Sequence, residues 1–215
     1  MTQGLPRIWI ITDPDHPDGP VAPLRRALEI CPPGLVGVQL RAHGVPDRQL
    51  IEWGLELRAL TQAQGCTLAV NRRIDVAEIV GADGVHLPES GLPLKDVREH
   101  WPAIHLLGVS RHDSVGLAAA ERGGASYAYL SPVFTVPGKA APIGIHGFRA
   151  AIADVDIPTY ALGGIEAEDL NPLLAAGAFG VAIRRAIYAS DSPEESLSRF
   201  LSALDKAGAN GEERA

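Results

Sequence analysis

The chain has 215 residues, of which 46% are apolar, and a formal net charge of −7. This length is enough for one domain with a sizeable core, and the acidic balance argues against a general nucleic-acid binder. No run reaches the roughly 18 consecutive apolar residues that a membrane span needs, so we expect no membrane association.

Eight short apolar segments alternate with helical patterns, which is typical of βα units and a parallel sheet. We expect strands at 7–12, 35–40, 67–71, 84–87, 104–110, 127–131, 158–162 and 180–183. The pattern predicts an α/β fold, a single (β/α)8 TIM barrel over 1–207, followed by a disordered tail at 208–215. An open doubly wound sheet is the alternative, but no Gly-x-Gly-x-x-Gly turn follows the first strand.

The boundaries of several helices can be predicted from single residues. Pro46 and Asp47 open the clearest helix, whose predicted apolar face contains Leu50, Ile51, Trp53, Leu55, Leu57 and Leu60. A weak repeat recurs at 80–87, 123–130 and 176–183, where a helix ends at Gly, Ala follows and a strand begins. Glycine at such a position takes the left-handed conformation of a helix cap.

Two features of the chain indicate a cytoplasmic protein. Residues 1–7 lead directly into the first apolar strand, so we expect no signal peptide. There are only two cysteines, Cys31 and Cys66. One disulfide is possible, but a reduced chain is the simpler interpretation.

The last two predicted strands carry a candidate phosphate site. One runs into Gly163 and Gly164, and the next ends in Arg184 and Arg185. Bare backbone N–H groups beside positive charge suit a phosphate, and barrel enzymes frequently bind phosphate after strands 7 and 8. We therefore expect a small phosphorylated ligand at this end of the barrel.

Basic side chains gather where the predicted strands end, although the whole chain is acidic. They are Arg41, Arg72, Arg73, Arg111, Lys139, Arg184 and Arg185. Three histidines, His43, His86 and His112, join them, and only Asp13 and Glu89 oppose them. This contrast favours an anionic substrate, although any one of these arginines can equally be a solvated surface residue.

Other residues on this rim have a structural interpretation as well as a functional one. His86 follows Val85 in a buried strand and is expected to be a hydrogen-bonded core histidine rather than a catalyst. The Gly- and Pro-rich loop 135–144, which holds Lys139, is expected to be an active-site lid rather than a passive loop. No spacing of His, Asp and Glu resembles a metal site.

Six motifs occur in order along the chain. They are Gln39-Leu40-Arg41, residues 70–77, residues 81–87, Gly108-Val109-Ser110, Pro132-Val133-Phe134 with Lys139, and Gly163-Gly164-Ile165. Together they resemble the thiamin phosphate synthase family, which includes a thiazole tautomerase branch. The resemblance covers residues 8–187 and implies a barrel that acts in thiamin biosynthesis.

The resemblance implies particular ligands and contacts. The synthases join an aminopyrimidine pyrophosphate to a thiazole phosphate and release pyrophosphate. By position, the pyrimidine pyrophosphate would be contacted by Gln39, Arg41, Asn71, Ser110 and Lys139. Gly164 and the turn at Arg184 and Arg185 would hold the thiazole phosphate.

The chain departs from this family at several positions. Arg72 and Gly91 stand where the synthases usually carry two aspartates that bind magnesium, so we expect no metal ligand set, and Arg72 is a candidate substitute for the metal. The usual lysine after Arg41-Ala42 is His43, a usual Thr-x-Thr is 136–138, and a usual serine is Arg185.

The lost aspartates favour tautomerase-type chemistry on a thiazole phosphate over magnesium-dependent synthesis. The histidine expected as the acid–base of the tautomerase branch is Pro132 here, which leaves His43 or His112 as a displaced acid–base. The alternatives are thiamin phosphate synthesis, with magnesium as its cofactor, a non-catalytic binder of thiazole phosphate or thiamin phosphate, and another phosphosugar barrel enzyme. A homodimer is also left open.

Overall fold

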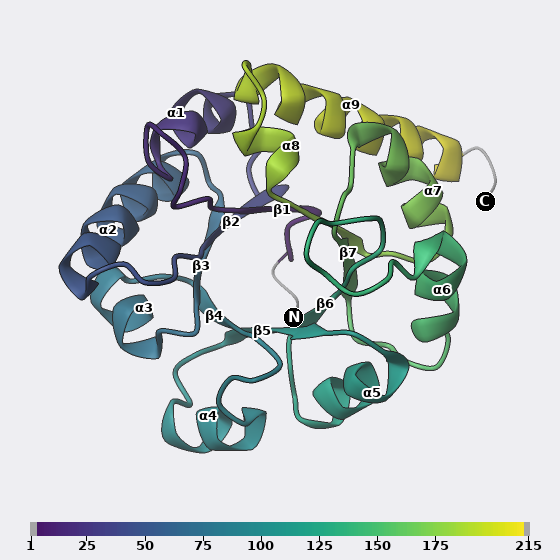
Figure 1. Ribbon diagram of the computed structural model, residues 1–215, viewed down its shortest axis with the longest axis horizontal. Coiled ribbons are helices and arrows are strands. Elements are labelled where there is room, and N and C mark those ends of the chain that lie inside the picture. Colours follow the sequence, from purple (N-terminus) through teal and green to yellow (C-terminus); the bar gives the residue numbers. More distant parts are fainter. Residues whose placement is uncertain (1–3, 213–215) are drawn as a thin grey trace.

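A computed structural model describes the backbone of residues 4–212 as a closed parallel barrel (Figure 1). Its strands, in chain order, are β1 Ile8–Ile11, β2 Val36–Leu40, β3 Thr67–Asn71, β4 Gly84–Leu87, β5 Leu106–Arg111, β6 Tyr127–Leu130, β7 Thr159–Leu162 and β8 Gly180–Ile183. Each strand pairs with its neighbour in sequence, and β8 closes on β1 through the register Ile8↔Val181. The predicted (β/α)8 barrel is confirmed.

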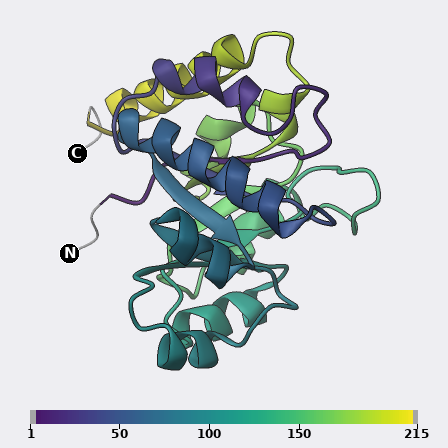
Figure 2. The ribbon, with the colours of Figure 1, turned by 90° about the vertical axis from the view of Figure 1, so that its left-hand side faces the viewer.

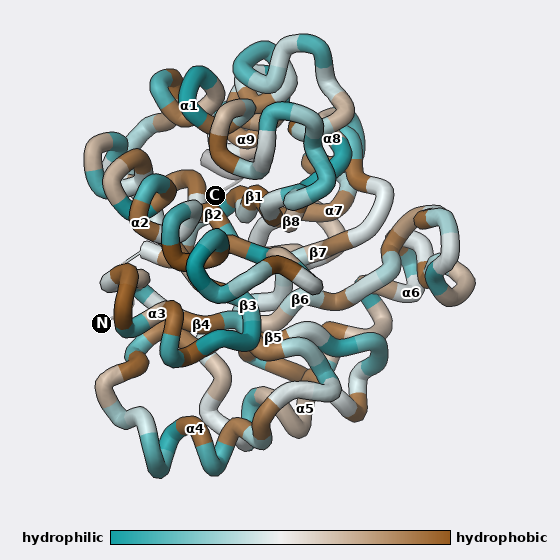
Figure 3. Tube along the Cα trace, turned by 60° about the vertical axis from the view of Figure 1, so that its left-hand side comes forward, coloured by the Kyte–Doolittle hydropathy of each residue, from teal (hydrophilic) through white to brown (hydrophobic). Residues whose placement is uncertain are grey.

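Helices surround the barrel and cover the outer faces of the strands (Figure 1). They are α1 Ala22–Glu29, α2 Asp47–Ala63, α3 Ile74–Val80, α4 Leu94–His100, α5 Ser114–Arg122, α6 Gly144–Ala151, the 3-10 turn η1 Ala167–Asp169, α7 Leu170–Ala175, α8 Arg185–Tyr188 and α9 Pro193–Glu212. Hydrophobic and hydrophilic turns alternate along helices such as α4 (Figure 3). This alternation is expected of helices that bury only one side.

The barrel interior is filled by aromatic rings. Trp9, Tyr127, Tyr129 and Tyr160 are fully buried, and the Trp9 and Tyr127 rings stack with centroids 5.2 Å apart. Glycine on neighbouring strands makes room for them. A Cβ atom at Gly108 would lie 2.1 Å from Cζ of Tyr127. The ring of Tyr127 therefore fits in the barrel interior only because residue 108 has no side chain.

The apolar face of α2 differs from the predicted one. Leu55, which was expected to face the core, is 50% exposed. The buried residues are Leu50, Gly54, Leu57 and Thr61, which follow the i, i+4, i+7, i+11 spacing of one helix face. Gly54 is buried because the helix approaches α3 closely there: a Cβ atom would lie 2.8 Å from a methyl of Val80.

The repeated glycine caps are present. Gly81, Gly124 and Gly177 all have positive φ, at 66°, 75° and 101°. Each stands between a helix and the strand that follows it. A residue with a Cβ is strained in this conformation, which explains why glycine recurs at these turns.

The segment expected to be a tail overlaps the last helix. The backbone is helical as far as Glu212 in α9, and residues 213–215 lie outside the described residues. Cys31 and Cys66 are buried free thiols. Within the described residues, no helix is both long and apolar enough to cross a membrane.

We expect the substitution Gly108→Ala to destabilise the protein by about 1–3 kcal/mol, because the added methyl overpacks a dense core and collides with the ring of Tyr127. Urea unfolding followed by circular dichroism measures this change. Gly208→Ala in α9 is the matched control, since nothing lies within 4 Å of its added methyl. Equal stability of the two variants would contradict the interdependence of ring and glycine.

Candidate active site

The predicted site residues lie where the strands end, on one face of the barrel. Because the sheet is parallel and closed, every βα loop meets at this face. The loop between β6 and α6, which carries Lys139, projects beyond the same face, while the first described residues lie at the opposite one (Figure 2). Lys139 itself is exposed, and its expected contact with a substrate stays a prediction.

Gln39 at the end of β2 and Asn71 at the end of β3 form a buried polar pair. The amide nitrogen of Gln39 donates a 3.0 Å hydrogen bond to the side-chain oxygen of Asn71, and the two residues are 2% and 8% exposed. The side-chain oxygen of Gln39 is buried and has no hydrogen-bond partner among the described residues. An unpaired buried acceptor is costly, so this oxygen is suited to a ligand's donor group.

His86 and Ser110 form a second polar pair, on β4 and β5. The Nε2 atom of His86 lies 2.9 Å from the hydroxyl of Ser110, and its Nδ1 atom lies 3.3 Å from the hydroxyl of Tyr127. Burial, helped by the nearby Arg111 charge, lowers the pKa of His86 to about 3. His86 is therefore neutral at pH 7 and helps to orient Ser110, in agreement with its prediction as a core histidine.

Tyr129 is a residue of this region that sequence reasoning missed. Its ring stacks on that of His86, with centroids 4.1 Å apart. Its hydroxyl is buried without a hydrogen-bond partner among the described residues. The alternation Tyr127-x-Tyr129 beside Gly108 was the available signal, because residues two apart on a strand face the same side.

Positively charged side chains follow three of four adjacent strands. Arg184 follows β8, Arg41 follows β2 and Arg72 follows β3, while Asp13, after β1, lies 3.7 Å from Arg184. Burial and then the Arg184 charge lower the pKa of Arg41, against the opposing effect of Asp13. The backbone of Arg41 is fixed by Thr12, whose hydroxyl accepts a 2.8 Å hydrogen bond from the Arg41 amide.

His43 lies between two of these arginines. Burial and the charges of Arg41 and Arg72 lower its pKa, so the neutral imidazole is favoured at neutral pH. His112 is also exposed. Its Nδ1 atom lies 2.6 Å from the carbonyl of Ser131, and its Nε2 atom lies 3.7 Å from Glu89. The two candidate acid–bases are therefore in different surroundings, and their catalytic roles stay predictions.

Arg73 does not contribute a free charge to this rim. Its guanidinium forms salt bridges with Asp47 and Asp75, and these contacts raise its pKa. The neighbouring Arg72 has no salt bridge among the described residues. The two adjacent arginines thus differ: carboxylates neutralise the charge of Arg73, whereas no carboxylate among the described residues pairs with Arg72.

The turn after β7 presents bare backbone, as predicted. Gly163 and Gly164 have φ values of 109° and 66°. A Cβ atom at Gly164 would lie 2.9 Å from the carbonyl oxygen of Thr135 in the β6–α6 loop. The loop also packs on this turn through a 2.9 Å hydrogen bond from the amide of Phe134 to the carbonyl of Gly163.

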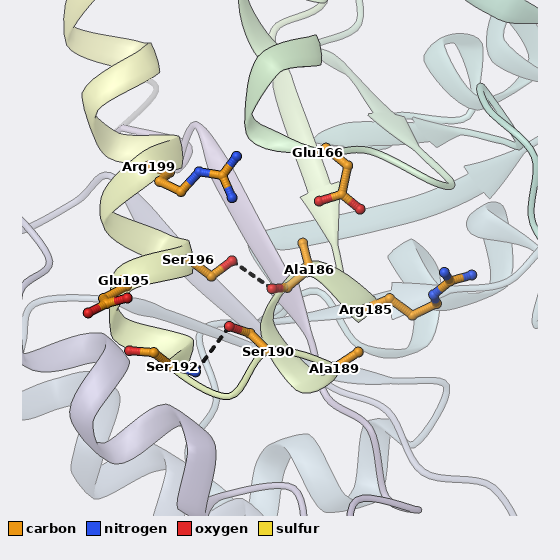
Figure 4. Close-up of a pocket in the computed structure, with 9 residues that line it drawn as sticks. All are labelled: Glu166, Arg185, Ala186, Ala189, Ser190, Ser192, Glu195, Ser196 and Arg199. Carbon is orange, nitrogen blue, oxygen red and sulfur yellow. Dashed lines mark hydrogen bonds between the residues drawn. The ribbon is translucent and has the colours of Figure 1, made fainter.

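Arg184 and Arg185, which were paired in the sequence interpretation, separate in the structure. Arg184 contacts Asp13 on the β1 side. Arg185 lines a cavity of about 310 Å³ between the β7–η1 turn, α8 and α9, together with residues such as Glu166 and Ser190 (Figure 4). The two guanidiniums therefore have different neighbours, and their expected contact with one phosphate stays a prediction.

A magnesium ion has no suitable ligand set at this face. Arg72 and Gly91 occupy the positions of the expected aspartates. Within the described part of the chain, no cluster of three or more His, Cys, Asp or Glu side chains can hold a metal. The two rim carboxylates, Asp13 and Glu89, face Arg184 and His112. The residues present do not fit this ion, which prefers several oxygen ligands.

The fold and this face define a class of protein, a (β/α)8 barrel with basic side chains at its strand ends. A family model described as "Thiamine monophosphate synthase" matches residues 8–187. The chain belongs to this family of thiamin biosynthesis, which confirms the resemblance seen in the sequence.

Individual relatives agree with the family match. A thiamine-phosphate synthase of Chloroflexus aurantiacus is 38% identical over 86% of this chain and 86% of its own length. One of Salinispora arenicola is 35% identical over 93% of this chain and 98% of its own length. The solved structure of a Pyrococcus furiosus thiamine phosphate pyrophosphorylase matches with a TM-score of 0.85 and 30% identity, covering 94% and 96% of the two chains.

The low pKa of His86 predicts a pH-dependent stability. In the unfolded chain His86 has a pKa near 6.5, whereas in the folded protein its pKa is about 3. Between these pH values only the unfolded chain binds a proton at His86. This contribution to stability is complete above pH 6.5 and falls by about 1.4 kcal/mol per pH unit as the pH drops below it. Urea unfolding between pH 4.5 and 7.5 should therefore show a steeper loss for the wild type than for His86→Gln. Parallel profiles would contradict a buried neutral histidine.

Proposed function

We propose that this protein is a thiamin phosphate synthase, which joins an aminopyrimidine pyrophosphate to a thiazole phosphate and releases pyrophosphate. One observation supports the proposal: the strand-end face has two separate places that would suit an anion. One is the group of Arg41, Arg72 and Arg184, and the other is the turn at Gly163 and Gly164. A synthase must hold two phosphorylated substrates, whereas a tautomerase holds one.

The buried polar groups between β2 and β5 suit the pyrimidine ring. The unpaired oxygen of Gln39 can accept a hydrogen bond from the exocyclic amine, and the hydroxyl of Ser110 is positioned by His86. The arginines that follow β2 and β3 would then meet the pyrophosphate. Lys139, on the projecting loop, would complete this site from above when the loop covers it.

The reaction requires charge stabilisation rather than a strong base. The bond between the pyrimidine methylene carbon and the pyrophosphate oxygen breaks, and its electron pair leaves with pyrophosphate. The thiazole nitrogen then donates its lone pair to the methylene carbon and forms the new C–N bond. Guanidiniums near the leaving group stabilise the charge that develops on it, and two bound rings gain from being held in line.

The names of the relatives favour this reaction over the tautomerase-type chemistry expected from the sequence. A tautomerase would need a positioned acid–base. His43 and His112 are the remaining candidates, and both are exposed. The cytoplasmic location, the contact of Lys139 and the possible homodimer belong to the proposal as expectations.

Product analysis after mixing the protein with both substrates tests the proposal. Thiamin phosphate and pyrophosphate should form in equal amounts in a magnesium-containing buffer, and neither should form when one substrate is omitted. Absence of both products, together with conversion of a thiazole carboxylate phosphate to its tautomer, would instead support the tautomerase. Tight binding of thiazole phosphate without any turnover would support the non-catalytic binder.

The glycine turn predicts a selective effect on one substrate. Gly164→Ala should raise the KM for thiazole phosphate roughly 10-fold or more, because its methyl crowds the Thr135 carbonyl and the backbone has a positive φ. The KM for the pyrimidine substrate should change little. Gly138→Ala on the neighbouring loop is the matched control, since it has a similar φ of 74° and open surroundings. Equal effects of both variants on both substrates would contradict the assignment.

A further inference from the structure

The rim of β8, β1, β2 and β3 brings like charges together. Arg184, Arg41 and Arg72 follow three of these adjacent strands, and Asp13 on the fourth is the carboxylate that faces Arg184. Arg41 is partly buried, and the positive charge of Arg184 acts with this burial to lower the pKa of Arg41. With only one carboxylate nearby, the three guanidiniums repel one another, and an anion bound among them would relieve this repulsion.

Arg72 adds an independent observation. Its φ is 65°, and it is the one non-glycine residue with a positive φ in the described part of the chain. Its amide donates a 2.9 Å hydrogen bond to the carbonyl of His86, which holds this conformation. A strained backbone of this kind persists where the fold over-determines it, and such residues cluster at functional sites. Glycine would occupy the position without strain.

We propose that Arg72 and Arg184 bind the diphosphate group of the substrate together with Arg41, and so neutralise it in place of a magnesium ion. The planar guanidinium suits phosphate oxygens because it can donate two parallel hydrogen bonds. Burial and the charges of Arg41 and Arg72 lower the pKa of His43, which disfavours a further positive charge there. Arg184 thereby belongs to the diphosphate site rather than to the thiazole phosphate site.

This inference rests on the proposed function, since it names how the same site holds the leaving group. Each guanidinium acts without proton transfer: it donates hydrogen bonds to phosphate oxygens before the C–O bond breaks and keeps them on the released pyrophosphate. Asp13 orients Arg184 and is a positioning residue, because its carboxylate faces the guanidinium at 3.7 Å.

Binding of inorganic pyrophosphate, measured by calorimetry in EDTA and in magnesium, tests the inference without turnover. We expect pyrophosphate to bind in EDTA at least as tightly as in magnesium. Arg72→Ala and Arg184→Ala should each weaken it at least 10-fold in EDTA. Arg73→Ala is the matched control, since Arg73 is already paired with Asp47 and Asp75. Binding that requires magnesium, or that survives both alanine substitutions, would overturn the inference.

Arg72→Gly separates a binding role from a structural one. Removing the strain should raise Tm by about 2–4 °C, while pyrophosphate binding should still weaken at least 10-fold. Arg72→Lys, which keeps a charge, should retain more of the binding than Arg72→Gly. An Arg72→Gly protein with raised Tm and unchanged pyrophosphate binding would overturn the role of Arg72.

Failure here and failure of the proposed function are distinguishable. Metal-free pyrophosphate binding that depends on Arg72 and Arg184, in a protein that makes no thiamin phosphate, would support the anion site and refute the synthase. Thiamin phosphate synthesis together with magnesium-dependent pyrophosphate binding would support the synthase and refute the arginine site.

Discussion

Closure of the parallel barrel is the constraint on which the rest of the structure depends. The pairing of β8 with β1 places Arg184 beside Asp13 and, one strand further, Arg41, although these residues are far apart in sequence. Parallel pairing brings all eight strand ends to one face. The interior rings seal the barrel below that face, so ligands meet a floor of buried polar groups rather than a pore.

This face of an acidic chain carries arginines that differ in how their charge is compensated. Its pairing pattern is selective: Arg73 is neutralised by two aspartates, whereas Arg72 beside it is held in a strained backbone without a carboxylate partner among the described residues. A substrate that loses an anionic leaving group would benefit from such a fixed array, because the donors need not reorganise during the reaction. The strained backbone at Arg72 is thus consistent with the binding role proposed for its side chain.

The sequence predicted the barrel and nearly every strand because continuous apolar runs and glycine caps are local signals. It predicted less well how side chains point. Leu55 is apolar but is half exposed on the outer side of α2. The neighbouring Gly54 lies on the buried side instead, where the helix packs closely on Val80 of α3. Arg184 and Arg185 are adjacent in sequence, yet their side chains have different neighbours where β8 gives way to α8. Arg72 and Arg73 differ through a backbone angle and through the salt bridges of Arg73 to Asp75, two residues away, and to the more distant Asp47. No local pattern encodes the backbone angle or the contact with Asp47.

We propose that this barrel makes thiamin phosphate with arginines in place of a metal. The steady-state rate of thiamin phosphate formation with both substrates, measured in EDTA and again in excess magnesium, tests this proposal most directly. We expect sustained formation in EDTA, at a rate within about 10-fold of that in magnesium, because guanidiniums rather than a metal would stabilise the charge on the leaving group. Formation only in magnesium would contradict it.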